Sequence, residues 1–159
     1  IISRFSNIYG PGQLNFTAII PDAIVSCIKN TKLTLRGNGE TIRDFIHVDD
    51  IVDVYKLLAE NLYLFPKKYS GEVFNAGTNS PKKIKDVVKA IYYYKNKYTE
   101  FKKTIKNIKK NKTTGEISVQ FMDFKKLHKY FKWKPKRKFE KTLPSLFKWY
   151  VSYLKKDNQ

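Results

Sequence analysis

The sequence is poor in cysteine, and it contains no long apolar run. Cys27 is the only cysteine among 159 residues, which excludes an internal disulfide and favours a reducing compartment. No apolar stretch approaches the roughly twenty residues that cross a bilayer. The first residues also lack the basic segment of a secretory signal. These absences predict a cytoplasmic protein with no membrane partner.

Histidine and glycine are scarce as well, and each scarcity excludes a type of site. The two histidines, His47 and His128, lie far apart in sequence without partners at metal-ligand spacing, so we expect no metal site. Gly10-Pro11-Gly12 and Gly37-Asn38-Gly39 both lack the third glycine that lets a helix N-terminus close on a pyrophosphate. We therefore expect this chain alone not to bind a dinucleotide.

The residues that are present predict a single α/β unit covering residues 1–155. Apolar residues make up 42% of the chain and include eleven Tyr and eleven Phe, enough for a core without disulfides or metals. Pro144 falls inside the last predicted helix and is expected to kink it or delay its start. Periodicity predicts strands at 1–8, 33–35, 72–76 and 117–122, and helices at 19–28, 49–62, 84–91, 123–131 and 139–154.

The net charge of +18 lies entirely in the second half of the sequence. Residues 1–80 contain eight Lys or Arg and eight Asp or Glu, whereas residues 81–159 contain twenty-four and six. Only four of the basic residues are Arg, whose planar fork suits phosphates and bases. We interpret the excess as a solvated surface and do not expect specific nucleic-acid binding. Residues 92–115, rich in Lys, Asn and Tyr, are expected to form a flexible insert or a solvated helix extension.

Polar residues at two places suggest a ligand site. Asn7 ends a predicted strand, where ligands of α/β sheets collect, although an Asn there can instead hold the following turn. Arg43 precedes a helix that starts near Val48; it could grip a phosphate through two hydrogen bonds or form an ion pair with Asp44 or Asp49. Asp49 and Asp50 are expected to cap that helix.

Four segments together resemble the extended short-chain dehydrogenase/reductases, the NAD-dependent epimerases and dehydratases of nucleotide sugars. The match covers nearly all of the chain except residues 92–115, and Lys132 stands where the family has a glycine. Gln13-Leu14-Asn15-Phe16 is most similar to the CDP-glucose 4,6-dehydratases. The matching segments are Arg4-Phe5-Ser6-Asn7-Ile8-Tyr9-Gly10-Pro11-Gly12, Arg43-Asp44-Phe45-Ile46-His47-Val48-Asp49-Asp50, Gly71-Glu72-Val73-Phe74-Asn75, and residues 116–135.

This resemblance implies the C-terminal part of a Rossmann-type enzyme with its smaller substrate-binding domain. The opening Ile1-Ile2-Ser3-Arg4 already lies in a predicted strand, so we expect the nucleotide-binding half to be absent and to act as a partner. NAD would be the cofactor of the full-length enzyme, with a nucleotide sugar as substrate and a homodimer allowed for the complete form. The implied substrate-binding residues are Asn7, Gln13, Leu14, Asn15 and Arg43, and the implied cofactor-binding residues are Phe5 and Ser6.

The implied reaction is conversion of a nucleotide hexose to its 4-keto-6-deoxy form. The family's catalytic Tyr-x-x-x-Lys pair would lie upstream, so we expect no catalytic residue here and no activity from this chain alone. Four such pairs do occur, but in Lys-rich segments where chance produces them; they begin at Tyr63, Tyr93, Tyr98 and Tyr130. The alternatives are a fragment of a 4-epimerase and a non-catalytic basic module or decayed gene product.

Overall fold

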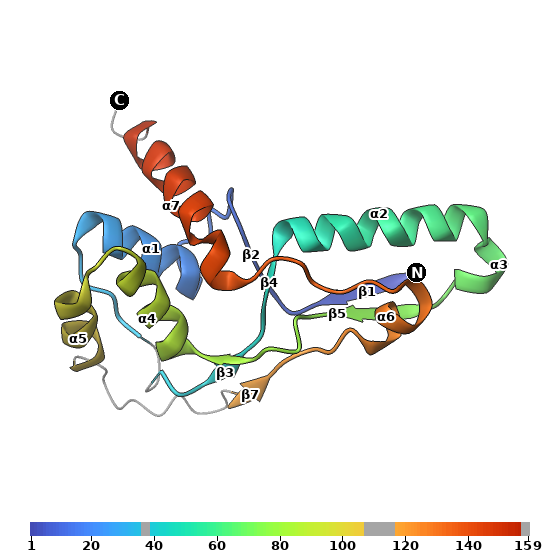
Figure 1. Cartoon of the computed structure of the whole chain (residues 1–159), viewed down its shortest axis with the longest axis horizontal. Helices are drawn as coiled ribbons and strands as arrows, with labels where there is room; N and C mark the ends of the chain where they lie inside the picture. The colour runs from blue at the N-terminus through green and yellow to red at the C-terminus, as the bar shows by residue number, and fades with distance from the viewer. Residues whose placement is uncertain (36–38, 107–116, 157–159) are drawn as a thin grey trace. The chain divides into compact units, whose positions relative to one another are not determined.

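The structure, a computed structural model, describes residues 1–35, 39–106 and 117–156 (Figure 1). It divides into two compact units, each built from three stretches of the sequence. Unit 1 comprises residues 1–10, 43–81 and 120–137, and unit 2 comprises residues 11–42, 82–119 and 138–159. The chain passes between the units near three two-residue strands: β3 (Ile42–Arg43), β6 (Lys82–Lys83) and β7 (Val119–Gln120).

Unit 1 is built on two pairs of parallel strands. Strand β1 (Ile2–Phe5) pairs with β5 (Val73–Ala76), and β2 (Asn7–Tyr9) pairs with β4 (Phe45–His47). The single strand predicted over residues 1–8 is therefore wrong in one respect, because it is interrupted at Ser6. Periodicity could not reveal this break, since it records which face is buried and not which strand is the neighbour.

The core of unit 1 lies between these strands and helix α2 (Val48–Leu64), which runs beside the β1–β5 pair in Figure 1. The helix buries Ile51, Val54 and Leu58, spaced three and four residues apart, in one cluster with Ile46 and Phe74. Two short helices, α3 (Pro66–Tyr69) and α6 (Lys125–Phe131), complete the unit. Burial of Leu127 places α6 in the same core.

The start of α2 corrects the predicted cap. The N-cap residue is His47, whose Nδ1 accepts the Asp49 N–H at 3.2 Å, and neither Asp49 nor Asp50 occupies that position. The helix begins one residue earlier than the acidic pair, so both carboxylates lie in its first turn, where they still oppose the positive end of the helix dipole. Asp50 is fully buried and has a different role, since it accepts two hydrogen bonds from the guanidinium and backbone N–H of Arg137.

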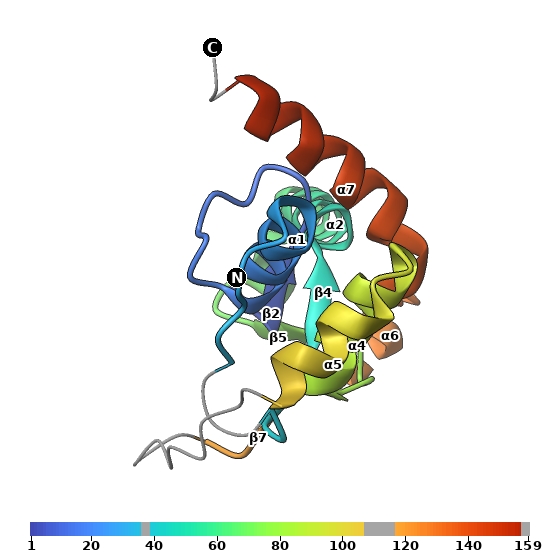
Figure 2. The ribbon, with the colours of Figure 1, turned by 90° about the vertical axis from the view of Figure 1, so that its left-hand side faces the viewer.

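Unit 2 is mainly helical, with α1 (Ile19–Lys29), α4 (Ile84–Tyr94), α5 (Tyr98–Lys106) and α7 (Phe139–Lys156). Figure 2 shows α1, α4 and α5 toward the viewer. Helix α4 lies against α1, α5 and α7, and fully buried Ile24, Ile91 and Leu146 supply apolar contact surface. No helix among the described residues is long and apolar enough to span a bilayer.

Several predicted elements differ from the observed ones. Residues 33–35 are not a strand, although Leu33 and Leu35 are buried; they fill the core without ladder hydrogen bonds. The strand predicted over 117–122 shrinks to β7, and α6 starts at Lys125. Helix α7 begins at Phe139, so Pro144 does not delay its start. Of the predicted insert 92–115, residues 92–106 carry the end of α4 and α5, and residues 107–115 lie outside the described residues.

Candidate functional site

The chain changes strand partners at Ser6, where the β1–β5 pair ends and the β2–β4 pair begins. The Ser6 N–H donates to the Ala76 carbonyl at 3.1 Å, while the next N–H, that of Asn7, donates to the Asp44 carbonyl at 3.0 Å. Ligands of α/β sheets bind outside the carboxyl ends of strands where neighbours change. The Ser6 hydroxyl oxygen is buried without a hydrogen-bond partner among the described residues, so the site offers an unsatisfied polar group at this point.

Asp44 organises the surroundings of Asn7 and Arg43. Its carbonyl also accepts the Asn7 side-chain amide at 3.1 Å, and its fully buried carboxylate accepts the Thr78 backbone N–H at 2.8 Å and the Thr78 hydroxyl. A side chain at Gly77 would collide with Asp44 and the Met122 carbonyl, so this close approach requires glycine. Half-buried Arg43 thus precedes a residue whose backbone and side chain are fixed by five hydrogen bonds.

Phe5 and Asn7, the residues on either side of Ser6, differ in their exposure to solvent. The Phe5 ring is half-buried against Tyr55, with ring centroids 5.1 Å apart, whereas Asn7 is exposed. The Asn7 side-chain amide donates to the Asp44 carbonyl, 37 residues away in sequence, and so ties β2 to the segment that leads into β4. Its exposed carbonyl oxygen retains acceptor capacity for a ligand.

In unit 2, the segment Gln13–Asn15 forms an ordered turn leading into α1. The buried Tyr150 hydroxyl donates to the Gln13 carbonyl at 2.8 Å. Asn15 Oδ1 accepts the Thr17 N–H at 3.1 Å and the Thr17 hydroxyl at 2.7 Å, which fixes the turn and leaves the Asn15 amide nitrogen exposed. Leu14 projects an apolar side chain that is 53% exposed.

A cavity of about 420 Å³ opens directly after this segment, entirely within unit 2. Its size lies in the range of small-molecule sites, and it combines apolar walls with hydroxyl and carboxylate groups. Burial raises the pKa of the Asp22 carboxyl, which a hydrogen bond from Ser26 partly offsets. The lining residues are Phe16, Thr17, Ile19, Asp22, Thr34, Thr41 and Ile84.

The structure thus groups the predicted site residues in two sets. Phe5, Ser6, Asn7 and Arg43 surround the strand ends of unit 1, and Gln13, Leu14 and Asn15 precede the cavity of unit 2. Sequence analysis missed the positioning roles of Asp44 and Tyr150. The Asp that follows Arg43 directly in the sequence was the available signal for Asp44. No signal pointed to Tyr150, because its contact with Gln13 joins residues 137 positions apart.

Parallel strands flanked by helices define an α/β protein. The family described as GDP-mannose 4,6 dehydratase matches residues 1–146. The chain therefore belongs to this family of extended short-chain dehydrogenase/reductases, which confirms the family and the α/β fold predicted from the sequence motifs.

Individual relatives are dehydratases and epimerases. A dTDP-glucose 4,6-dehydratase of Haemophilus influenzae is 28% identical over 158 residues, covering 95% of this chain and 44% of that protein. The crystal structure of a dTDP-glucose 4,6-dehydratase of Bacillus anthracis in complex with NAD is 30% identical with a TM-score of 0.73, covering 94% of this chain and 44% of that one. A UDP-N-acetylglucosamine 4-epimerase of Methanobrevibacter ruminantium is 26% identical with a TM-score of 0.73, covering 95% and 46%. The chain thus spans less than half the length of these relatives.

Proposed function

We propose that this chain is the substrate-binding portion of a nucleotide-sugar 4,6-dehydratase. The observation that carries the proposal is the change of strand partners at Ser6, which sets Asn7 and Arg43 at the strand ends of a family member. Asn7 and Arg43 bind the substrate diphosphate, and Gln13, Leu14 and Asn15 contact the nucleotide. The adjoining cavity of unit 2 supports this assignment, because its volume suits a nucleotide base and its walls mix apolar and polar groups.

In the complete enzyme NAD would supply hydride transfer at C4 of the hexose, and the reaction would remove water across C5 and C6. Phe5 and Ser6 adjoin the cofactor in this proposal. The buried Ser6 hydroxyl without a partner fits such a neighbour, because a polar group brought there would satisfy it. Phe5, held against Tyr55, excludes water from the same edge. The other proposed site residues bind and orient the substrate. The catalytic acid and base lie in a nucleotide-binding half that is not part of this sequence.

The finer substrate assignment is CDP-glucose, supported by the resemblance of Gln13-Leu14-Asn15-Phe16 to that group of dehydratases. The two dehydratases named above are dTDP-glucose enzymes, so comparing the affinities of CDP, UDP and dTDP for the complete enzyme decides this point. We expect CDP to bind tightest. We also expect the isolated chain to show no micromolar NAD affinity in calorimetry.

Substitution of Arg43 tests the diphosphate site. Arg43→Ala in the complete enzyme should weaken the binding of nucleoside diphosphate by about thirtyfold, since a charge-assisted bidentate contact contributes roughly 2 kcal/mol. Arg43→Lys should recover only part of this loss, because the lysine retains the charge without the planar fork.

Arg4→Ala is the matched control, because Arg4 is an exposed arginine of the same unit in β1. It should leave nucleotide affinity unchanged. Unaltered affinity in Arg43→Ala, with only the melting temperature reduced, would make Arg43 a structural residue and remove the proposed phosphate site.

A 4-epimerase is the second candidate, favoured by the similarity to the Methanobrevibacter ruminantium enzyme. Both reactions proceed through a ketone at C4, and only the dehydratase eliminates water. The mass of the product therefore separates the two candidates.

A further inference from the structure

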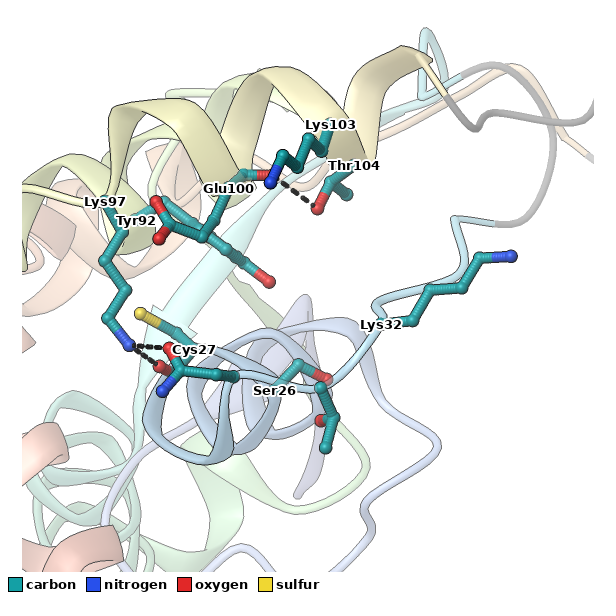
Figure 3. Close-up of a pocket in the computed structure, with 10 residues that line it drawn as sticks. Ser26, Cys27, Lys32, Tyr92, Lys97, Glu100, Lys103 and Thr104 are labelled. Atoms are coloured by element: carbon teal, nitrogen blue, oxygen red, sulfur yellow. Dashed lines mark hydrogen bonds between the residues drawn. The ribbon is translucent and has the colours of Figure 1, made fainter.

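A second cavity, of about 490 Å³, lies within unit 2 between the end of α1 and the α4–α5 pair. It shares no lining residue with the cavity that follows Gln13–Asn15. Figure 3 shows Tyr92 and Glu100 on one side and Cys27 and Ser26 of α1 on the other. Its volume lies within the range of small-molecule sites.

Three lysines line this cavity, and Figure 3 shows their side chains at different sides of it. Lys97 donates to the Asn30 side-chain oxygen at 2.5 Å and to the Cys27 carbonyl, which leaves one of its three N–H donors for a ligand (Figure 3). Lys32 and Lys103 also line the cavity, and neither has an ion-pair partner among the described residues. Glu100 is the single acidic residue of the lining. An anionic group is therefore favoured near the lysines.

The remaining wall is suited to hydroxyl groups over an apolar floor. The Glu100 carboxylate and the Asn30 amide can accept hydrogen bonds from hydroxyls, and the Thr104 hydroxyl is held in place by its bond to the Glu100 carbonyl at 3.0 Å. Cys27 and Tyr92, exposed by 1% and 2%, form the floor. Burial raises the pKa of both the Cys27 thiol and the Tyr92 hydroxyl, so each stays neutral at pH 7.

We propose that this cavity binds a small phosphorylated polyol, with the phosphate on Lys103 and the hydroxyls on Glu100 and Asn30. The two ends of such a ligand match the two chemistries of the wall. Phosphate alone would leave the Glu100 side without a donor, and an uncharged polyol would leave Lys103 without an anion. The site is independent of the nucleotide contacts proposed for Asn7 and Arg43.

Glucose 6-phosphate is the probe, titrated into the complete protein by calorimetry. We expect saturable one-site binding that excess CDP does not weaken. Lys103→Gln should lower the affinity about tenfold, the effect of one lost charge-assisted contact. Lys102→Gln is the matched control, since it removes the same charge from the neighbouring position of α5 without touching the cavity. It should change the affinity less than about twofold, because an exposed charge outside the cavity contributes little.

The thiol of Cys27 reports where the ligand binds, because it lies in the cavity floor. Bound glucose 6-phosphate should slow its reaction with a small thiosulfonate reagent, and glucose at equal concentration should not. The proposal is overturned by the absence of saturable binding up to about 10 mM, a limit weaker than most metabolite sites. It is equally overturned by equal losses in the two lysine variants, by equal affinity for inorganic phosphate, or by displacement with CDP.

Discussion

The two units hold their polar groups in contrasting ways. In unit 1 the buried carboxylates of Asp44 and Asp50 accept hydrogen bonds from the backbone, so they fix strand ends and the start of α2. In unit 2 the ion pairs Lys82–Glu140 and Lys83–Glu40 lie at the surface, with N–O distances of 2.9 and 2.8 Å. Unit 2 also carries twenty Lys or Arg against seven Asp or Glu, compared with twelve against seven in unit 1.

This difference bears on the sites proposed for the two units. The Asp44 contacts fix the backbone next to Arg43 in unit 1, and the phosphate site proposed for Arg43 requires such a fixed position. Cavities bordered by exposed lysines, as in unit 2, supply charge with less rigidity. Substitutions of buried and of exposed polar groups therefore test this difference between the units.

The largest effect is expected from Asp50→Asn in unit 1. It removes the ion pair from Asp50 to Arg137, whose N–O distance is 2.7 Å, and replaces a fully buried carboxylate that also accepts the Arg137 backbone N–H. Unfolding free energy, measured with urea, should fall by about 3 kcal/mol. Asp53→Asn is the control, because Asp53 contacts the same guanidinium at 2.8 Å but is 32% exposed. A loss for Asp53→Asn as large as that for Asp50→Asn would contradict the role given to burial.

A smaller effect is expected from Tyr150→Phe in unit 2. The change deletes only the hydroxyl that holds the Gln13 carbonyl, so stability should drop by about 1 kcal/mol. Burial raises the pKa of this hydroxyl to about 12, so the hydrogen bond should persist across neutral pH. Nucleotide affinity should also decline, since Gln13 loses its anchor. Tyr153→Phe, on the same helix, is the comparison; full nucleotide affinity in Tyr150→Phe would separate Gln13 from the binding site.

The pH dependence of stability tests the His47 cap. Burial, opposed by Asp49 and Asp50 and assisted by Arg137, lowers the pKa of His47 below its value in the unfolded chain. A neutral His47 therefore contributes stability that is complete above about pH 6.5 and is lost as the pH falls. Melting temperatures between pH 5 and 8 measure this slope. His47→Asn keeps a capping oxygen and should flatten it; an unchanged slope would place the titrating group elsewhere.

The smallest effect belongs to the exposed pair of unit 2. Glu140→Gln removes its ion pair with Lys82, and both side chains are at least a third exposed, so stability should change by no more than about 0.5 kcal/mol. The stability change caused by Glu140→Gln should differ only slightly between high and low salt, because salt screens a contribution that is already small. A loss comparable to that of Asp50→Asn would erase the distinction between the units.

Helix positions were the most predictable part of the fold, because apolar spacing of three and four residues survives in α1, α2, α4 and α7. Features that depend on distant partners were not predictable. The break at Ser6 requires knowing that β5 and β4 are different neighbours, and the buried Leu33–Leu35 pair looks the same in sequence whether or not it joins a ladder. The cap of α2 was missed because Asp is a commoner capping residue than His.

The same division applies to the candidate site. Asn7 and Arg43 could be named from motifs, since their positions relative to a turn and a helix start are local. The hydrogen bonds that Asp44 makes to Asn7 and Thr78 cross 37 and 34 residues, and no local pattern encodes them. Geometry at the site therefore follows from the pairing of strands and not from the motifs alone.

The central claim is that this family member serves in dehydration of a nucleotide sugar. The most direct measurement is the mass of the product formed from CDP-glucose and dTDP-glucose by the complete enzyme. The account predicts a product one water lighter than its substrate, with CDP-glucose turned over faster. A product of unchanged mass, or no product from either sugar, would contradict it.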